Sequence, residues 1–139
     1  MKNTIRISAV LLALLLCLSL VACGAKREGV WEDATYTTDK TFGNGDKTVT
    51  LTVSAEDQEV TFTIKTDEET LADALLAHDL IEGEDGAFGI YVKKVNGITA
   101  DYDVDKSYWS LEVNGEMSFV GASYVTVEDG ASYAFTRAK

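Results

Sequence analysis

Four carboxylates in the second half of the chain have the spacing of a calcium-binding loop. They are Asp101, Asp103, Asp105 and Glu112, at the first, third, fifth and twelfth positions of that pattern. Lys106 stands where the pattern has a glycine for its sharp turn, and it brings a positive charge into the site. The residues that follow also read as a strand instead of a helix. The series is a candidate calcium site, and a solvated acidic loop is the alternative.

A second candidate lies between Tyr108 and Tyr124, where a predicted hairpin leads into an apolar loop. Apolar and polar residues alternate from Trp109 to Val113, as in a half-buried strand. Asn114-Gly115 suits the positive φ angles of a type I′ turn. The residues that follow place apolar and aromatic groups around Gly121, which suits either core packing or contact with a flat apolar ligand.

A third chemical signal lies near the N-terminus, at Cys23. Basic residues precede an apolar run from Ala9 to Ala22, as in a secretory signal peptide. The segment Leu20-Val21-Ala22-Cys23 resembles a bacterial lipobox, whose cysteine sulfur receives diacylglycerol before cleavage. The run is short for a transmembrane anchor, which is the alternative. We therefore predict a signal peptide at 1–22 and a lipid anchor on Cys23 that holds the protein on the extracytoplasmic face of the cell membrane.

Charge and cysteine content exclude several functions. Without the signal peptide the chain keeps 23 acidic and 10 basic residues, a formal charge of 10 − 23 = −13, which disfavours nucleic acid as a partner. Cys17 leaves with the signal peptide and Cys23 is acylated, so no thiol remains for a disulfide, a zinc site or a nucleophile. With a single histidine and no recognisable catalytic constellation, we expect a protein that is not an enzyme.

The elements that position these residues indicate an α+β fold. Alternating β-branched residues predict a hairpin over 48–65, and Thr66 with Glu69 has capping-box spacing for a following helix. Residues 82–86 read as a loop, 88–95 as a strand and 131–136 as a final strand. This order predicts a β-grasp-like mixed sheet with one helix packed across it. Residues 23–46 read as the lipidated cysteine and a flexible tether, which leaves a domain at 47–139.

Several motifs together resemble one family. They are Leu71-Ala-Asp-Ala-Leu75, Gly89-Ile-Tyr-Val-Lys-Lys-Val-Asn-Gly-Ile98, Tyr108-Trp109, Val113-Asn-Gly-Glu116, Val120-Gly-Ala-Ser123 and Val127-Glu-Asp-Gly130. Their order and spacing resemble the transcobalamin-like C-terminal domain (domain of unknown function 4430), in its bacterial lipoprotein form. In transcobalamin and intrinsic factor, that domain closes over one face of cobalamin while a larger helical domain holds the other. The larger domain is missing here.

The resemblance implies a ligand-facing role for the apolar segment, and the composition of the loop adds Met117. The resulting ligand-binding set is Trp109, Met117, Phe119, Gly121, Ala122 and Tyr124. For Trp109, packing into the interior is the alternative. The set requires that Phe119 and Tyr124 remain accessible to solvent beside a concavity at Gly121.

We therefore expect a membrane-anchored ligand-binding lipoprotein, with cobalamin or a related corrinoid as first candidate ligand. A domain that covers only one face of the ligand buries only about half of its surface, so a partner protein would complete the pocket. The sequence leaves two other functions open: a surface module that binds calcium or another divalent metal, and a module that binds a protein or a glycan.

Overall fold

A long antiparallel hairpin forms the middle of the main sheet. Its strands are β2 (Lys47–Ala55) and β3 (Gln58–Thr66). Val, Leu, Ile and Phe side chains are buried on one face of the hairpin, and Thr side chains alternate with them on the more exposed face. The hairpin predicted over 48–65 is therefore confirmed. The computed structural model describes residues 24–139, so the predicted signal peptide and Cys23 lie outside the described residues.

The hairpin belongs to a six-stranded mixed sheet in the order β1-β3-β2-β9-β7-β8. Strands β1 (Lys40–Gly43) and β9 (Ser132–Ala138) run parallel to their neighbours β3 and β2. Strand β7 (Tyr108–Val113) lies antiparallel to β9 and turns into the short β8 (Glu116–Met117). Asn114 and Gly115 have φ angles of 50° and 83°, so the predicted hairpin turn is confirmed. Strand β9 confirms the last strand predicted over 131–136.

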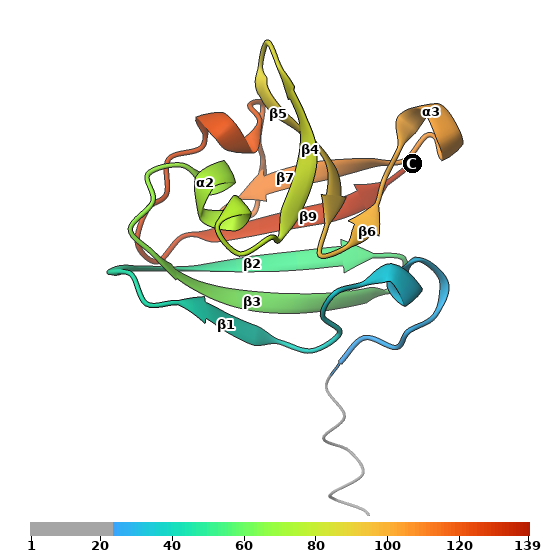
Figure 1. Cartoon of the computed structure of the whole chain (residues 1–139), viewed down its shortest axis with the longest axis horizontal. Coiled ribbons are helices and arrows are strands. Elements are labelled where there is room, and N and C mark those ends of the chain that lie inside the picture. The colour runs from blue at the N-terminus through green and yellow to red at the C-terminus, as the bar shows by residue number, and fades with distance from the viewer. Residues whose placement is uncertain (1–23) are drawn as a thin grey trace, which may run out of the picture.

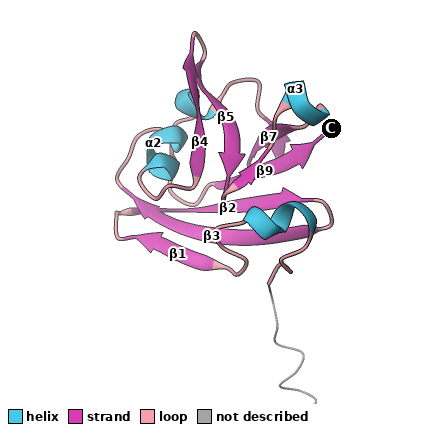
Figure 2. Ribbon diagram, turned by 45° about the vertical axis from the view of Figure 1, so that its right-hand side comes forward, coloured by secondary structure: helices cyan, strands magenta, loops and turns pink. Residues whose placement is uncertain are grey.

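A second, three-stranded sheet stands on one face of the first (Figures 1 and 2). It contains β4 (Ile81–Gly86), β5 (Gly89–Val95) and β6 (Ile98–Thr99), and the β4–β5 hairpin projects from the molecule. The prediction of a loop at 82–86 is wrong. Those residues lack an apolar pattern, but β5 supplies backbone pairing, and cross-strand ion pairs join Glu82 to Lys94 and Glu84 to Lys93.

The predicted helix forms, but it is short and begins later than the capping-box spacing indicates. Helix α2 spans Leu71–Leu76, and the Thr70 hydroxyl caps it by accepting a hydrogen bond from the Asp73 N–H. The Thr66 hydroxyl instead accepts from the Glu68 N–H in the turn before the helix. α2 lies on the same side of the main sheet as β4 and β5, as Figure 1 shows. The α+β class is therefore confirmed.

The prediction of a flexible tether at 24–46 is wrong for the residues that the structure describes. After the 3₁₀ turn η1 (Gly29–Asp33) the chain enters β1, so this segment is part of the fold. Trp31 has no exposed surface, and its indole N–H donates to the carbonyl of Ala55 at 2.8 Å. Tyr36 and Phe42 stack edge to face with Phe62 of β3. Aromatic anchors thus order a segment whose composition is that of a linker.

Candidate functional site: an apolar recess between two strand edges

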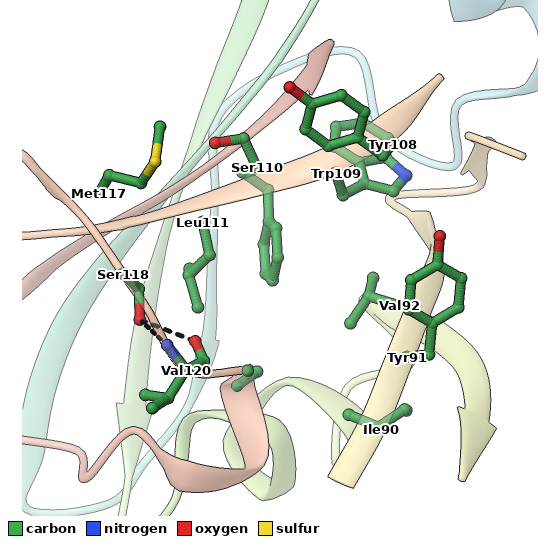
Figure 3. Close-up of a pocket in the computed structure, with 13 residues that line it drawn as sticks. Ile90, Tyr91, Val92, Tyr108, Trp109, Ser110, Leu111, Met117, Ser118 and Val120 are labelled. Carbon is green, nitrogen blue, oxygen red and sulfur yellow. Dashed lines mark hydrogen bonds between the residues drawn. The ribbon is translucent and has the colours of Figure 1, made fainter. Parts of the chain in front are cut away.

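An apolar recess of about 330 Å³ lies between β5, β7 and the chain that follows β8 (Figure 3). Its volume is at the lower end of the range for small-molecule sites. No charged residue lines it. The lining residues are Ile90, Tyr91, Val92, Tyr108, Trp109, Ser110, Leu111, Met117, Ser118, Val120, Gly121, Ala122 and Phe135.

The recess borders the edges of two strands instead of the face of one. Residues 108–111 of β7 all line it, as do residues 90–92 of β5. Successive side chains of a strand point to opposite faces, so an unbroken run of lining residues means that the edge of the strand faces the recess. Figure 3 shows β7 above the opening, β5 to its right, and Ser118 and Val120 on the remaining side.

Trp109 lines the recess and carries a polar group without a hydrogen-bond partner among the described residues. Its side chain is 9% exposed and meets the ring of Phe135 edge to face, with centroids 6.4 Å apart. The indole Nε1 is buried and has no hydrogen-bond partner among the described residues. Buried donors are almost always paired, so this one marks an incomplete environment. Trp109 therefore both packs into the core and lines the recess.

The loop after β8 closes the other side of the recess and is fixed to β5. The Ser123 hydroxyl accepts a hydrogen bond from the Ile90 N–H at 3.0 Å. Gly89 approaches the same serine so closely that a Cβ on Gly89 would lie 2.5 Å from the Ser123 Cβ. The Ser118 hydroxyl bonds both backbone groups of Val120, which shapes the loop before the 3₁₀ turn η2 (Ala122–Tyr124).

The structure separates the six predicted ligand-binding residues into two groups. Trp109, Met117, Gly121 and Ala122 line the recess. Phe119 and Tyr124 do not line it, but they are 98% and 58% exposed, so both side chains are accessible to a large ligand. Together with Phe88 of the β4–β5 turn, which is 84% exposed, they leave aromatic surface open to water close to the recess.

Sequence reasoning missed the contribution of β5. Ile90, Tyr91 and Val92 read as ordinary strand residues, and no local signal places β5 opposite β7. Residues from β7 and β9, Tyr108 and Phe135, were missed for the same reason. Only the tertiary arrangement brings these segments together.

The four predicted metal ligands do not form a metal site. Among residues 24–139, no group of three or more His, Cys, Asp or Glu side chains could hold a metal ion. Residues 102–105 form a short helix, α3 (Tyr102–Asp105), whose cap Asp101 accepts from the Asp103 N–H, while Glu112 lies on β7. Lys106 takes the left-handed conformation at the end of α3, with φ of 63°, where the calcium pattern needs a glycine.

Asp105 is bound to other partners. The hydroxyl of the buried Ser107 donates to its carboxylate, and the Arg137 guanidinium lies 2.8 Å from it. These hydrogen bonds, that from the Ser107 side chain first, lower the pKa of Asp105 to about 2. Its carboxylate fixes α3 to β9, so it is not free to bind a cation.

The fold and the recess define a small α+β domain with an apolar surface site. The family model described as "Domain of unknown function (DUF4430)" matches residues 68–136. A crystal structure from Ruminococcus gnavus ATCC 29149, provisionally described as a metal binding protein, is 30% identical with a TM-score of 0.64, covering 68% of this chain and 98% of that one. The chain belongs to the DUF4430 family, and the family predicted from the sequence is confirmed.

A second solved structure has a similar fold. Haptocorrin in complex with Cbi matches with a TM-score of 0.55 and 20% identity, over 70% of this chain. The match spans only 26% of the haptocorrin chain. The comparison with curated proteins returned no match. Within the described residues, no helix has the length and apolar character needed to span a membrane.

Proposed function

We propose that this protein is an extracytoplasmic, lipid-anchored binding protein, not an enzyme, and that its ligand occupies the recess between β5 and β7. One observation carries the proposal. An uncharged recess lies close to aromatic side chains as exposed as Phe119, in a chain whose net charge is −11. Exposed apolar clusters of this kind on soluble domains mark binding surfaces. The anchor rests on the sequence signal that ends at Cys23.

A corrinoid is the first candidate ligand. The similar fold of haptocorrin in complex with Cbi supports this choice. A corrin offers a broad apolar face with amides at its rim, which suits aromatic contact and hydrogen bonds to backbone and hydroxyl groups. A recess of about 330 Å³ is too small to enclose a corrin, so this domain would cover only part of the ligand and a partner protein would cover the rest.

The arrangement of strands supports a β-grasp-like fold for the domain. The hairpin β2–β3 precedes α2, and β9 then returns to lie parallel to β2 at the centre of the sheet. In this arrangement the recess lies on the far side of β9 from the hairpin, at the β7 edge.

The corrinoid proposal is tested by titrating the full-length protein with cobalamin and with cobinamide while recording the corrinoid absorption spectrum. Phe119→Ala should weaken binding by about tenfold, because one aromatic contact is lost. The melting temperature should not change, because Phe119 is 98% exposed. Val104→Ala is the matched control, since Val104 is 81% exposed on α3. An unchanged spectrum at saturating corrinoid would rule out this ligand class.

Divalent-cation binding is the second candidate function, favoured by the description of the Ruminococcus gnavus protein. Because residues 24–139 contain no group of three or more ligand side chains, a cation would need further ligands from a second molecule. Calcium should then raise the melting temperature in a way that depends on protein concentration, and a chelator should reverse the effect. A melting temperature insensitive to both additions would exclude this function.

A further inference from the structure

Strand β7 is paired along one edge and mostly unpaired along the other. β9 pairs with every residue from Tyr108 to Val113, whereas β8 pairs only with Glu112 and Val113. One further bond extends the β8 side, from the Ser118 N–H to the carbonyl of Leu111 at 2.9 Å. The next residue along this edge, Trp109, has no strand beside it.

The backbone of Trp109 faces this open edge. Backbone groups alternate in direction along a strand, so the N–H and C=O of Trp109 point the same way as those of Leu111, away from β9. Within residues 24–139, no hydrogen bond reaches either group. The indole N–H of the same residue is also unpaired, although the side chain is only 9% exposed.

The recess lies along this edge. Residues 108–111 line one side of it, residues 90–92 of β5 a second side, and the loop after β8 a third, as Figure 3 shows. A strand edge with a free donor and acceptor beside an apolar hollow matches the requirements of β-strand addition. In that mode, main-chain hydrogen bonds provide affinity and a pocket receives alternate side chains of the peptide. An extended peptide meets these requirements better than a rigid ring does.

Charge specifies the peptide further. The β7–β8 hairpin carries Glu112 and Glu116 and no Lys or Arg. Neither glutamate takes part in an ion pair among the described residues. Glu116 is exposed on β8 and precedes Met117, which lines the recess. A peptide with basic residues would gain complementary charge here, and an acidic one would be repelled.

We propose that the recess binds an extended segment of a partner protein, with alternating basic and apolar residues, which adds to the open edge of β7 and pairs with the backbone of Trp109. The inference rests on the recess being the binding site of the proposed function, and it names a peptide instead of a corrinoid as the occupant. The sequence left a protein-interaction function open, and this inference names the class of partner for it.

The test uses the full-length protein, labelled with nitrogen-15, and short peptides that alternate lysine with valine, leucine or phenylalanine. The backbone amide and indole signals of Trp109 should shift, and its amide should exchange more slowly with solvent, because it gains a hydrogen bond. Trp31 is the internal control. Its indole donates to Ala55 and should not respond.

A second peptide series tests the backbone pairing itself. Peptides with the same sequence, but methylated at alternate backbone nitrogens, should bind about tenfold more weakly because they cannot donate to β7. Glu112→Gln with Glu116→Gln should weaken the unmethylated peptides, and this effect should diminish in high salt.

The outcomes separate this inference from the proposed ligand. If peptides shift the Trp109 signals, if backbone methylation of the peptides weakens their binding, and if no corrinoid binds, the results support a peptide ligand and exclude a corrinoid. Corrinoid binding in the absence of any peptide-induced shift at Trp109 would overturn the inference and leave the proposed function intact. Equal binding of methylated and unmethylated peptides would also overturn it.

Discussion

The side chain of Asn96 bonds both backbone groups of Tyr36. Its Oδ1 accepts from the Tyr36 N–H at 2.9 Å, and its Nδ2 donates to the Tyr36 carbonyl at 2.8 Å. Asn96 is fully buried in the turn between β5 and β6. The amide thus replaces a strand partner for an N-terminal segment that lies 60 residues away. This side chain, together with the hydrogen bond from the Thr35 N–H to the Asn96 carbonyl at 2.8 Å, joins the N-terminal segment to the second sheet.

Replacing this amide should destabilise the fold. Asn96→Gly keeps a backbone that tolerates the φ of 51° but leaves two backbone groups of Tyr36 unpaired, so we expect the free energy of unfolding to fall by about 2 kcal/mol. Asn114→Gly, at an exposed turn with φ of 50°, is the control. Its Oδ1 accepts only from the exposed Ser132 N–H, which water can satisfy in the variant, so the loss should be less than about 1 kcal/mol. Urea unfolding measures both. Equal losses would show that the clamp contributes nothing beyond turn geometry.

The two tryptophans should respond differently to the same substitution. Trp31→Phe removes the donor to the Ala55 carbonyl, whereas Trp109→Phe removes a donor that has no partner in the described chain. We expect Trp31→Phe to be more destabilising by about 1 kcal/mol, because it removes a buried hydrogen bond and Trp109→Phe does not. Thermal and urea unfolding of the two variants check this. A larger loss for Trp109→Phe would contradict the assignment of its indole as unpaired.

Gly89 should tolerate no side chain. A Cβ at this position would lie 2.5 Å from the Ser123 Cβ, and φ is +82°. Gly130→Ala is a matched control, because Gly130 has φ of +83° and no atom within 4 Å of an added Cβ. Both variants carry the backbone cost of about 1 kcal/mol, but only Gly89→Ala should also separate β5 from the loop.

The two glycine variants are compared by urea unfolding and by hydrogen exchange of the Ile90 amide, which bonds Ser123. Faster exchange in Gly89→Ala alone would show that the clash opens this side of the recess. Identical exchange in both variants would contradict a tight contact between Gly89 and the loop.

The carboxylate of Asp105 should make stability depend on pH in the acid range. The hydrogen bond from Ser107 is the main cause that lowers its folded pKa to about 2, from an ordinary value of 3.8. A lowered folded pKa contributes stability above the unfolded pKa, and that contribution is lost as pH falls from about 4 through 2. Ser107→Ala should raise the pKa of Asp105, measured from the carboxyl carbon shift by NMR. An unchanged titration would show that Ser107 is not the cause.

Sequence patterns predicted the elements that have strong local signals. Alternation gave β2 and β3, and the Asn114-Gly115 turn gave the β7–β8 hairpin. The strand β4 escaped prediction because Glu82, Glu84 and Asp85 have low strand propensity, and their pairing with β5 is what orders them. The order of residues 24–46 was not predicted for a similar reason, because Trp31 and Asn96 fix this segment through contacts that no local pattern encodes.

The candidate site shows the same division. The family resemblance implied a ligand-facing role for the loop residues Gly121 and Ala122, but the wall formed by β5 depends on how the second sheet stands on the first. The acidic spacing from Asp101 to Glu112 matched a calcium pattern by sequence, yet α3 and β7 direct those carboxylates to different places. Spacing predicts a metal site only when the intervening backbone has the conformation that the pattern assumes.

The central pairing of the main sheet joins β2 to β9 in parallel, with Leu51 of β2 opposite Tyr133 of β9. During synthesis on the ribosome, the hairpin of β2 and β3 emerges early and must wait with one edge bare until residues 132–138 follow. Such a bare edge is exposed to aggregation and to chaperones for as long as translation of the intervening chain lasts. Production of this protein should therefore be sensitive to elongation rate and to any truncation that removes β9.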